Sequence, residues 1–183
     1  MHRTTFLLAL LVLVAACQHQ GTPRPNATPS RSRYPGDLAR ARPLTRAERS
    51  QFTETSHYDD VVRFIDSLRV LGADIATGSI GKTNEGRDIP YVVASRPVVR
   101  TPLEARRLAR PIVYVQGNIH AGEVEGKEAL QSLLRDLLFD RHANVLDSIV
   151  LIAVPIYNAD GNERFAPQET NRGAQNGPPL VGV

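Results

Sequence analysis

Residues 111–123 read PIVYVQGNIHAGE, and this stretch decides the fold that the sequence predicts. Its first half, IVYV at 112–115, is a short apolar run of β-branched and aromatic residues, which predicts a strand buried on both faces. Gly117 ends the run, and a tight turn then carries His120 and Glu123. The sequence therefore places an imidazole and a carboxylate directly after a strand.

An amphipathic helix is predicted after this turn. Leucines in EVEGKEALQSLLRDLLFD have the spacing of one helical face: Leu130, Leu133, Leu134, Leu137 and Leu138. A second wholly apolar run, SIVLIAVPIYN at 148–158, predicts another buried strand. Two buried strands joined by a helix form a βαβ unit, so the sequence predicts an α/β domain. His120 and Glu123 would then lie beyond the carboxyl end of a strand, where open α/β sheets form ligand sites.

The preceding segment predicts a helix and a hairpin. SHYDDVVRFIDSLRVLG at 56–72 has apolar residues at helical spacing, with Thr55 or Ser56 as the candidate cap. Residues 73–95 predict two strands around the turn NEG. Pro90 indicates an edge position or the start of the second strand.

The amino terminus resembles a bacterial lipoprotein signal. His2 and Arg3 precede an apolar run at 6–14 that is too short to span a bilayer, and small residues then lead to Cys17 in VAAC. In proteins with such a signal the lipobox cysteine becomes acylated. Residues 1–17 would then form the signal segment, which ends at Cys17. An ordinary secretory signal with an incidental cysteine is the alternative. We favour the lipoprotein, because Cys17 is the only cysteine and falls at the position that the lipobox requires.

Residues 18–50 predict a disordered tether between this signal and a folded domain at 51–183. Pro, Ser, Thr, Gly and Arg dominate it, with almost no large apolar residue whose burial would offset the loss of conformational entropy. Seven arginines against Asp37 and Glu48 give residues 18–49 a net charge of +5, and Arg3 adds one more. Because the whole chain has a net charge of +3, residues 50–183 carry −3. The pI of about 9.3 is therefore a property of the tail and does not indicate nucleic-acid binding.

From Tyr58 onward the sequence resembles the amino-terminal half of the zinc carboxypeptidase family, the carboxypeptidase A-like metallopeptidases. Four blocks match in order: the helix with Tyr58 and its hairpin IGKTNEGRDI, then GNIHAGE with the H-x-x-E zinc motif, then VPIYNADGNERF, then NRGAQNGP. The ordered set is far more specific than an H-x-x-E pair alone. The resemblance implies a mixed sheet with flanking helices.

The resemblance also implies that His120 and Glu123 are two ligands of one Zn²⁺, an ion that imidazole and carboxylate groups suit. Arg172 is the best match to the arginine that polarises the scissile carbonyl, and Arg164 is a weaker match. A solvated loop arginine is the alternative for Arg172. The third zinc ligand and the general-base glutamate lie further downstream in the family. His142 is not that third ligand, because it follows the far end of the predicted helix.

The implied activity is zinc-dependent removal of C-terminal residues from peptides or proteins with a free C-terminus. We expect a domain that is incomplete at the carboxyl terminus, an inactive fragment, and export to the bacterial cell envelope on its periplasmic or outer-membrane face. The alternatives are a zinc-dependent deacylase of acyl-amino acids and a non-catalytic peptide-binding surface lipoprotein. The long helix and the NEGR hairpin favour the peptidase.

Two other features are interpreted as structural. A relaxed phosphate-loop pattern at 76–83 is followed by a turn and Pro90 rather than by a helix, so we expect a hairpin and no nucleotide. Glu125 and Glu128 are expected in the first turns of the helix, for dipole and solvent reasons.

Replacing Cys17 tests the lipoprotein prediction. In a bacterial host the chain should incorporate labelled fatty acid and partition with membranes, because acylation at Cys17 adds a buried alkyl anchor. Cys17→Ala should abolish both, as measured by labelling and membrane fractionation. Unchanged labelling and partitioning of the variant would show that no anchor is attached there.

Overall fold

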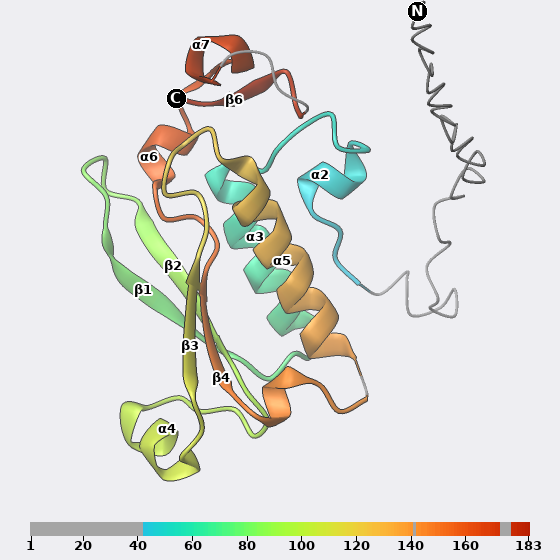
Figure 1. The fold of residues 1–183 in the computed structure, drawn as a ribbon, viewed down its shortest axis with the longest axis vertical. Helices are drawn as coiled ribbons and strands as arrows, with labels where there is room; N and C mark the ends of the chain where they lie inside the picture. Colours follow the sequence, from blue (N-terminus) through green and yellow to red (C-terminus); the bar gives the residue numbers. More distant parts are fainter. Residues whose placement is uncertain (1–41, 141, 173–176) are drawn as a thin grey trace, which may run out of the picture. The chain divides into compact units, whose positions relative to one another are not determined.

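The predicted α/β organisation is present in the computed structural model, which describes residues 42–140, 142–172 and 177–183. The predicted signal, and the predicted tether as far as residue 41, lie outside the described residues. Everything described belongs to one compact unit. Its elements are, in chain order (Figure 1), α2 Arg46–Arg49, α3 Tyr58–Val70, β1 Ala76–Lys82, β2 Asp88–Ala94, α4 Pro102–Leu108, β3 Ile112–Gln116, α5 Val124–Phe139, the short 3₁₀ helix η1 Val145–Asp147, β4 Val150–Val154, α6 Ala159–Asn162, β5 Phe165–Pro167, α7 Gln168–Arg172 and β6 Leu180–Gly182.

Four strands form a mixed sheet in the order β1–β2–β4–β3. β1 and β2 make the predicted hairpin, and residues 76–83 lie within it rather than before a helix. β2 pairs antiparallel with β4, whereas β3 pairs parallel with β4. Gln116 lies opposite Val154, so the two parallel strands end together and their following loops leave the same edge of the sheet. The unit β3–α5–β4 is the predicted βαβ unit.

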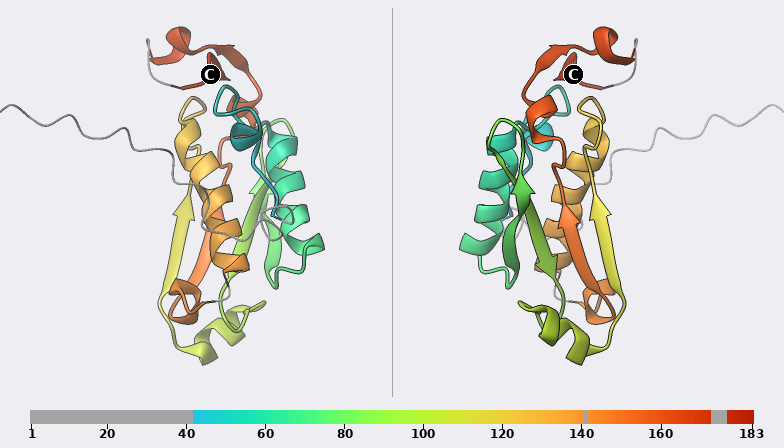
Figure 2. Two further views of the ribbon diagram at one scale, coloured as in Figure 1. Left: turned by 90° about the vertical axis from the view of Figure 1, so that its right-hand side faces the viewer. Right: turned by 90° about the vertical axis from the view of Figure 1, so that its left-hand side faces the viewer.

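Helices α3 and α5 lie on one face of the sheet and enclose the main core (Figure 2). The buried residues of α3 have helical i, i+3, i+4, i+7 spacing, as predicted: Val61, Phe64, Ile65 and Leu68. From α5, Leu130 and Leu134 are buried, whereas Leu133 is 42% exposed. They pack against residues of β2 and β4, namely Val92, Ala94, Leu151 and Ala153. No helix in the described ranges is long and apolar enough to cross a membrane.

The prediction that residues 112–115 are buried on both faces is wrong for this chain. Ile112 is 55% exposed and Tyr114 is 49% exposed. In contrast, four of the five residues of β4 are buried. The difference comes from position, because β4 has a strand on each side whereas β3 is at the edge of the sheet. Both runs are apolar, so composition alone does not distinguish a central strand from an edge strand.

The folded unit begins before residue 51, so the predicted end of the tether at residue 50 is too late. Thr45 and Glu48 form a capping box around α2. Glu48 also accepts a hydrogen bond at 2.5 Å from Nη1 of Arg135 in α5, and Arg135 is only 8% exposed. We name residues 42–50 the amino-terminal clasp.

Residues 158–183 contain more regular structure than the single turn predicted there. Asn158 caps α6, its Oδ1 accepting from the N–H of Gly161 at 3.0 Å. β5 and β6 pair antiparallel as a separate two-stranded sheet. These elements are short and rich in Gly, Pro and Asn, so they lack the periodicity on which sequence prediction depends.

A close contact between two glycines joins β3 to α5. Gly117 follows β3, and Gly126 lies in the first turns of α5. A Cβ built on Gly117 would lie 2.7 Å from the backbone carbonyl carbon of Gly126. A Cβ built on Gly126 would lie 3.3 Å from the Cα of Gly117. The strand end and the helix therefore meet backbone to backbone.

Alanine substitutions at these two positions should have different effects. Gly117→Ala should lower the free energy of unfolding by about 1–3 kcal/mol, because the new methyl group meets backbone that cannot move aside. Gly126→Ala should change it by less than about 1 kcal/mol, since the gain in helix propensity offsets milder crowding. Urea denaturation of both variants measures this. A Gly117→Ala variant as stable as the wild type would contradict the contact.

Candidate functional site

The predicted ligands His120 and Glu123 lie together on the turn between β3 and α5. Nδ1 of His120 is 3.1 Å from Oε2 of Glu123. The N–H of Glu123 donates to the carbonyl oxygen of His120 at 3.0 Å, which closes the turn. The His120 side chain is 74% exposed and the Glu123 side chain 39%. The turn therefore presents both groups to solvent; we name residues 118–123 the ligand turn.

Asn118 holds the ligand turn from inside. It has φ = 57°, a left-handed conformation that asparagine tolerates better than most residues. Its side-chain Nδ2 donates to the carbonyl oxygen of Ala121 at 3.0 Å, and its own carbonyl accepts from the N–H of Asn158 at 2.9 Å. Gly161 packs against the same turn, since a Cβ there would lie 2.9 Å from the Cβ of Ala121. The NADG segment at 158–161 thus supports the ligand turn.

A buried lysine lies one helical turn after the ligand turn. Lys127 is fully buried, at 0% exposure. Its Nζ donates to the carbonyl oxygen of Ser56 and to Oδ1 of Asn162. Burial lowers the pKa of Lys127 from 10.5 to about 8, although the charges of Glu128 and Glu163 act in the opposite direction.

Glu128 is partly buried and its carboxylate is hydrogen-bonded within the protein, which corrects the prediction made for it. Its carboxylate accepts from the N–H and the hydroxyl of Ser56, at 2.6 and 3.0 Å, and from the hydroxyl of Thr55 at 2.8 Å. Because these hydroxyls bind Glu128, neither residue caps α3, and His57 is its N-cap. Glu125, in contrast, is exposed as predicted.

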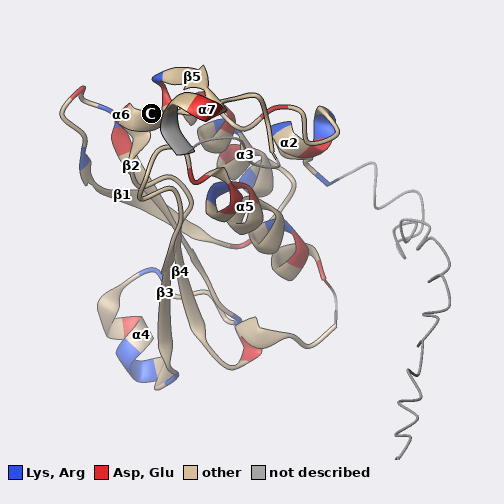
Figure 3. Cartoon of the chain, turned by 45° about the horizontal axis from the view of Figure 1, so that its top comes forward, with Lys and Arg blue, Asp and Glu red and all other residues tan. Residues whose placement is uncertain are grey.

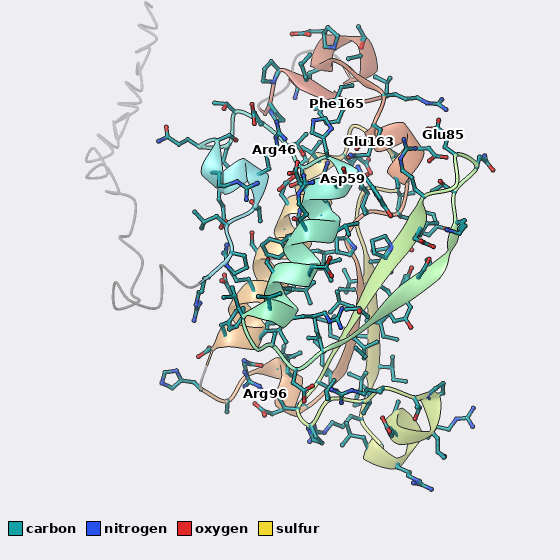
Figure 4. All side chains as sticks on the ribbon, turned by 180° about the vertical axis from the view of Figure 1, so that it is seen from behind. Arg46, Asp59, Glu85, Arg96, Glu163 and Phe165 are labelled. Carbon is teal, nitrogen blue, oxygen red and sulfur yellow. The ribbon has the colours of Figure 1, made fainter. Side chains whose placement is uncertain are left out.

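Glu163, which is labelled in Figure 4, forms the other end of this cluster and is partly buried, with its side chain 25% exposed. It accepts from Nδ2 of Asn162 at 2.8 Å and from the N–H of Tyr58 at 2.7 Å. Burial raises the pKa of Glu163, but these hydrogen bonds and the nearby His57 hold it below its usual value. The His57 ring stacks on Phe165 with ring centroids 4.1 Å apart. We name five residues the lysine network: Glu128, Ser56, Lys127, Asn162 and Glu163.

An ion-pair cluster joins the tip of the β1–β2 hairpin to α6, where basic and acidic residues gather (Figure 3). Nη1 of Arg87 is 2.6 Å from Oε2 of Glu85 and 2.7 Å from Oδ1 of Asp160. Arg164 binds the same hairpin, its Nη2 lying 2.8 Å from Oε1 of Glu85. Arg164, the weaker candidate for polarising the carbonyl, is therefore directed at the hairpin tip.

The remaining predicted residues lie apart from the ligand turn or outside the described atoms. Arg172 is the last residue of α7, and its side chain is outside the described part, so its role stays a prediction. Cys17 lies outside the described residues. His142 lies beyond the far end of α5, is 93% exposed and pairs with Asp140 at 3.1 Å. The sequence predicts this place for it, at the far end of the helix from His120.

A sequence model of the zinc carboxypeptidase family matches residues 61–182. The match includes the hairpin, the ligand turn and the NADG segment. The chain belongs to the zinc carboxypeptidase family.

Two fungal relatives of this zinc carboxypeptidase chain are the probable carboxypeptidase 2 of Trichophyton verrucosum (strain HKI 0517) and the carboxypeptidase 2 of Trichophyton rubrum. Each is 34% identical to it over 84 residues. Each match covers 44% of this chain and 15% of the fungal protein. The chain thus matches only a small part of the length of these curated relatives.

Solved structures share the fold. The crystal structure of carboxypeptidase A from Helicoverpa armigera matches with a TM-score of 0.51 at 21% identity, covering 68% of this chain and 32% of that one. The bovine thrombin-activatable fibrinolysis inhibitor, in complex with tick carboxypeptidase inhibitor, matches with a TM-score of 0.51 at 13% identity, covering 73% and 42%. These matches confirm the predicted carboxypeptidase-like α/β fold with a mixed sheet.

The chemistry of the ligand turn fits part of a zinc site. Catalytic zinc is commonly held by two histidines and one glutamate, with a water in the fourth position. The ligand turn offers one imidazole and one carboxylate within 3.1 Å of each other. In the part of the chain that the structure describes, no group of three or more His, Cys, Asp or Glu residues could hold a metal. Of the three protein ligands that such a site commonly uses, the ligand turn offers candidates for two.

Sequence reasoning missed three residues that support the site: Asn118, Lys127 and Asn162. The sequence contained a signal for one of them. Lys127 precedes Leu130 by three positions and Leu134 by seven, so it falls on the buried face of α5. A charged residue on an apolar helical face predicts a buried polar partner. Asn118 and Asn162 gave no comparable periodic signal.

Lys127 should make stability increase with pH above 8. Its pKa is about 8 in the folded chain against 10.5 without burial, so the unfolded state binds more protons between these values. The cost of burying the charge is present in full below pH 8 and disappears as pH rises. We expect a gain of up to about 3 kcal/mol in unfolding free energy by pH 10.5.

Denaturation curves at pH 7–10 measure this gain. Lys127→Met should remove the increase, whereas Lys82→Met, at an exposed lysine of the hairpin, should keep it. Identical pH profiles for the wild type and Lys127→Met would contradict the assignment.

Proposed function

We propose that this chain is the amino-terminal part of a zinc-dependent metallocarboxypeptidase that hydrolyses C-terminal residues from peptides and proteins. One observation carries the proposal: in a chain of the zinc carboxypeptidase family, His120 and Glu123 converge to 3.1 Å at the carboxyl end of β3. The name of the fungal relatives, carboxypeptidase 2, supports peptides rather than acyl-amino acids as substrates.

In this proposal His120 and Glu123 hold one Zn²⁺. Bound zinc would supply a Lewis acid that polarises the peptide carbonyl and lowers the pKa of a water. The chain's own contribution is to present the two ligands on a turn that Asn118 fixes internally. Arg172 is proposed to stabilise the negative charge that develops on the carbonyl oxygen. Its place in α7, at the same end of the molecule as the ligand turn, supports this role (Figure 1).

The proposed activity needs further residues besides the two candidate ligands of the ligand turn. A catalytic zinc site uses three protein ligands, and peptide hydrolysis needs a proton acceptor for the attacking water. In the proposal, which the family resemblance supports, the third ligand and the acceptor come from residues after 183. We therefore expect the 183-residue chain to bind zinc more weakly than a complete site and to hydrolyse no peptide by itself.

Location forms a further part of the proposal. We infer a lipid anchor at Cys17 that holds the domain in the bacterial cell envelope, on the periplasmic or outer-membrane face. The VAAC lipobox after a short apolar run supports it.

Removing one ligand tests the metal site. His120→Ala should reduce Zn²⁺ affinity at least about tenfold, because a single carboxylate cannot replace the pair. Isothermal titration with Zn²⁺ measures this, with circular dichroism to check the fold. His142→Ala is the matched control, since that histidine lies at the other end of α5 and should leave the affinity unchanged. Undiminished zinc binding by His120→Ala would overturn the proposal.

A further inference from the structure

The ligand turn is held at both ends. At its first residue, Asn118 accepts from the backbone of Asn158, just before α6. At its last residue, Glu123 leads directly into α5. Lys127 then reaches from the first turns of α5 to Asn162, the last residue of α6. These contacts form a closed ring through the ligand turn, α5, Lys127 and α6.

We propose that Lys127 is a positioning residue for the zinc site: its ammonium group ties α5 to α6, and so holds His120 and Glu123 in the arrangement that binds the metal. The inference rests on the proposed function, since it concerns the same metal. Lys127 does not touch either ligand; it acts through the two helices between which the ligand turn is fixed.

The side chains around Lys127 explain why a cation occupies this position. A buried charge is tolerated when hydrogen bonds and opposite charges surround it. Glu128 and Glu163 bind the partners of the lysine, Ser56 and Asn162, so both negative charges lie one hydrogen bond away. An apolar side chain at 127 would leave Oδ1 of Asn162 buried without this donor. The lysine therefore joins α5 to α6 through a directional hydrogen bond, which an apolar side chain cannot make.

The network also joins a third segment to this ring. The carbonyl of Ser56, two residues before α3, accepts from both Lys127 and Nδ2 of Asn162. Asp60 in the first turn of α3 adds a further negative charge that acts on Lys127. The start of α3 is thus held against the same two helix ends.

Metal titration of the whole 183-residue chain tests the inference. Zn²⁺ affinity is measured by calorimetry, and the visible absorption of bound Co²⁺ reports the geometry of the ligands. Lys127→Met should weaken Zn²⁺ binding about tenfold or more and alter the Co²⁺ spectrum, as loss of outer-sphere support does at other metal sites. Lys82→Met, at an exposed lysine, should match the wild type. Wild-type affinity and spectrum in Lys127→Met would overturn the inference.

Variants at Asn162 keep the inference testable if Lys127→Met does not fold. Asn162→Asp retains the acceptor for the ammonium group but loses the amide that donates to Glu163 and Ser56, so it should bind Zn²⁺ more tightly than Asn162→Leu, which loses both. Asn162→Leu removes the acceptor at similar volume and should weaken binding as Lys127→Met does. If both Asn162 variants bind Zn²⁺ equally well, the inference is wrong. If Lys127→Met and Asn162→Leu both fold, the double variant should weaken binding by less than the sum of the two single effects, because the contact between Lys127 and Asn162 is lost in each of them.

The outcomes separate this inference from the proposed function. If His120→Ala lowers Zn²⁺ affinity while Lys127→Met and Asn162→Leu bind like the wild type, only the role of Lys127 is refuted. If the wild-type chain binds neither ion, or His120→Ala binds like the wild type, the proposed metal site fails and the role of Lys127 fails with it.

Discussion

The backbone of Gly117 fixes where the site lies, and the other contacts depend on it. Its N–H donates to the carbonyl of Val154 at 2.9 Å, and its carbonyl accepts from the N–H of Tyr157 at 3.1 Å. These bonds continue the parallel pairing of β3 and β4 beyond the ends of both strands. On its other side Gly117 meets Gly126 backbone to backbone. One residue without a side chain thus joins the sheet, the helix and the residue before the NADG segment at a single point, from which the ligand turn projects.

Much of this arrangement could be predicted from sequence, because the signals are local. The apolar run at 112–115, the break at Gly117 and the leucine spacing of α5 follow one another without interruption. They determine a strand, a turn and a helix, and hence the place of His120 and Glu123 at the strand's carboxyl end. The H-x-x-E pair needs only three residues of separation, so a correct local turn is enough to bring its two side chains together.

The support around the site could not be predicted in the same way, because its contacts join distant parts of the chain. Ser56 and Asn162, which share Lys127, are 106 positions apart. The burial of Glu128 depends on hydroxyls 72 and 73 positions away. The exposure of β3 likewise depends on its place at the edge of the sheet. The pattern of apolar residues within the strand does not reveal that place. Periodicity identified the faces of the helices, but not which polar groups would meet between them.

The amino-terminal clasp determines where a protease can cut without damaging the folded unit. Cleavage after Arg24, Arg31, Arg33 or Arg40 would remove Cys17 and leave every described contact in place. Cleavage after Arg40 would change the net charge from +3 to −1. Cleavage after Arg49 would instead remove Glu48 and leave the guanidinium of Arg135 buried without that carboxylate. With the proposed lipid anchor at Cys17, the same folded unit would have a membrane-held form and, after such cleavage, a shed form, which would differ in net charge and in location while sharing one ligand turn.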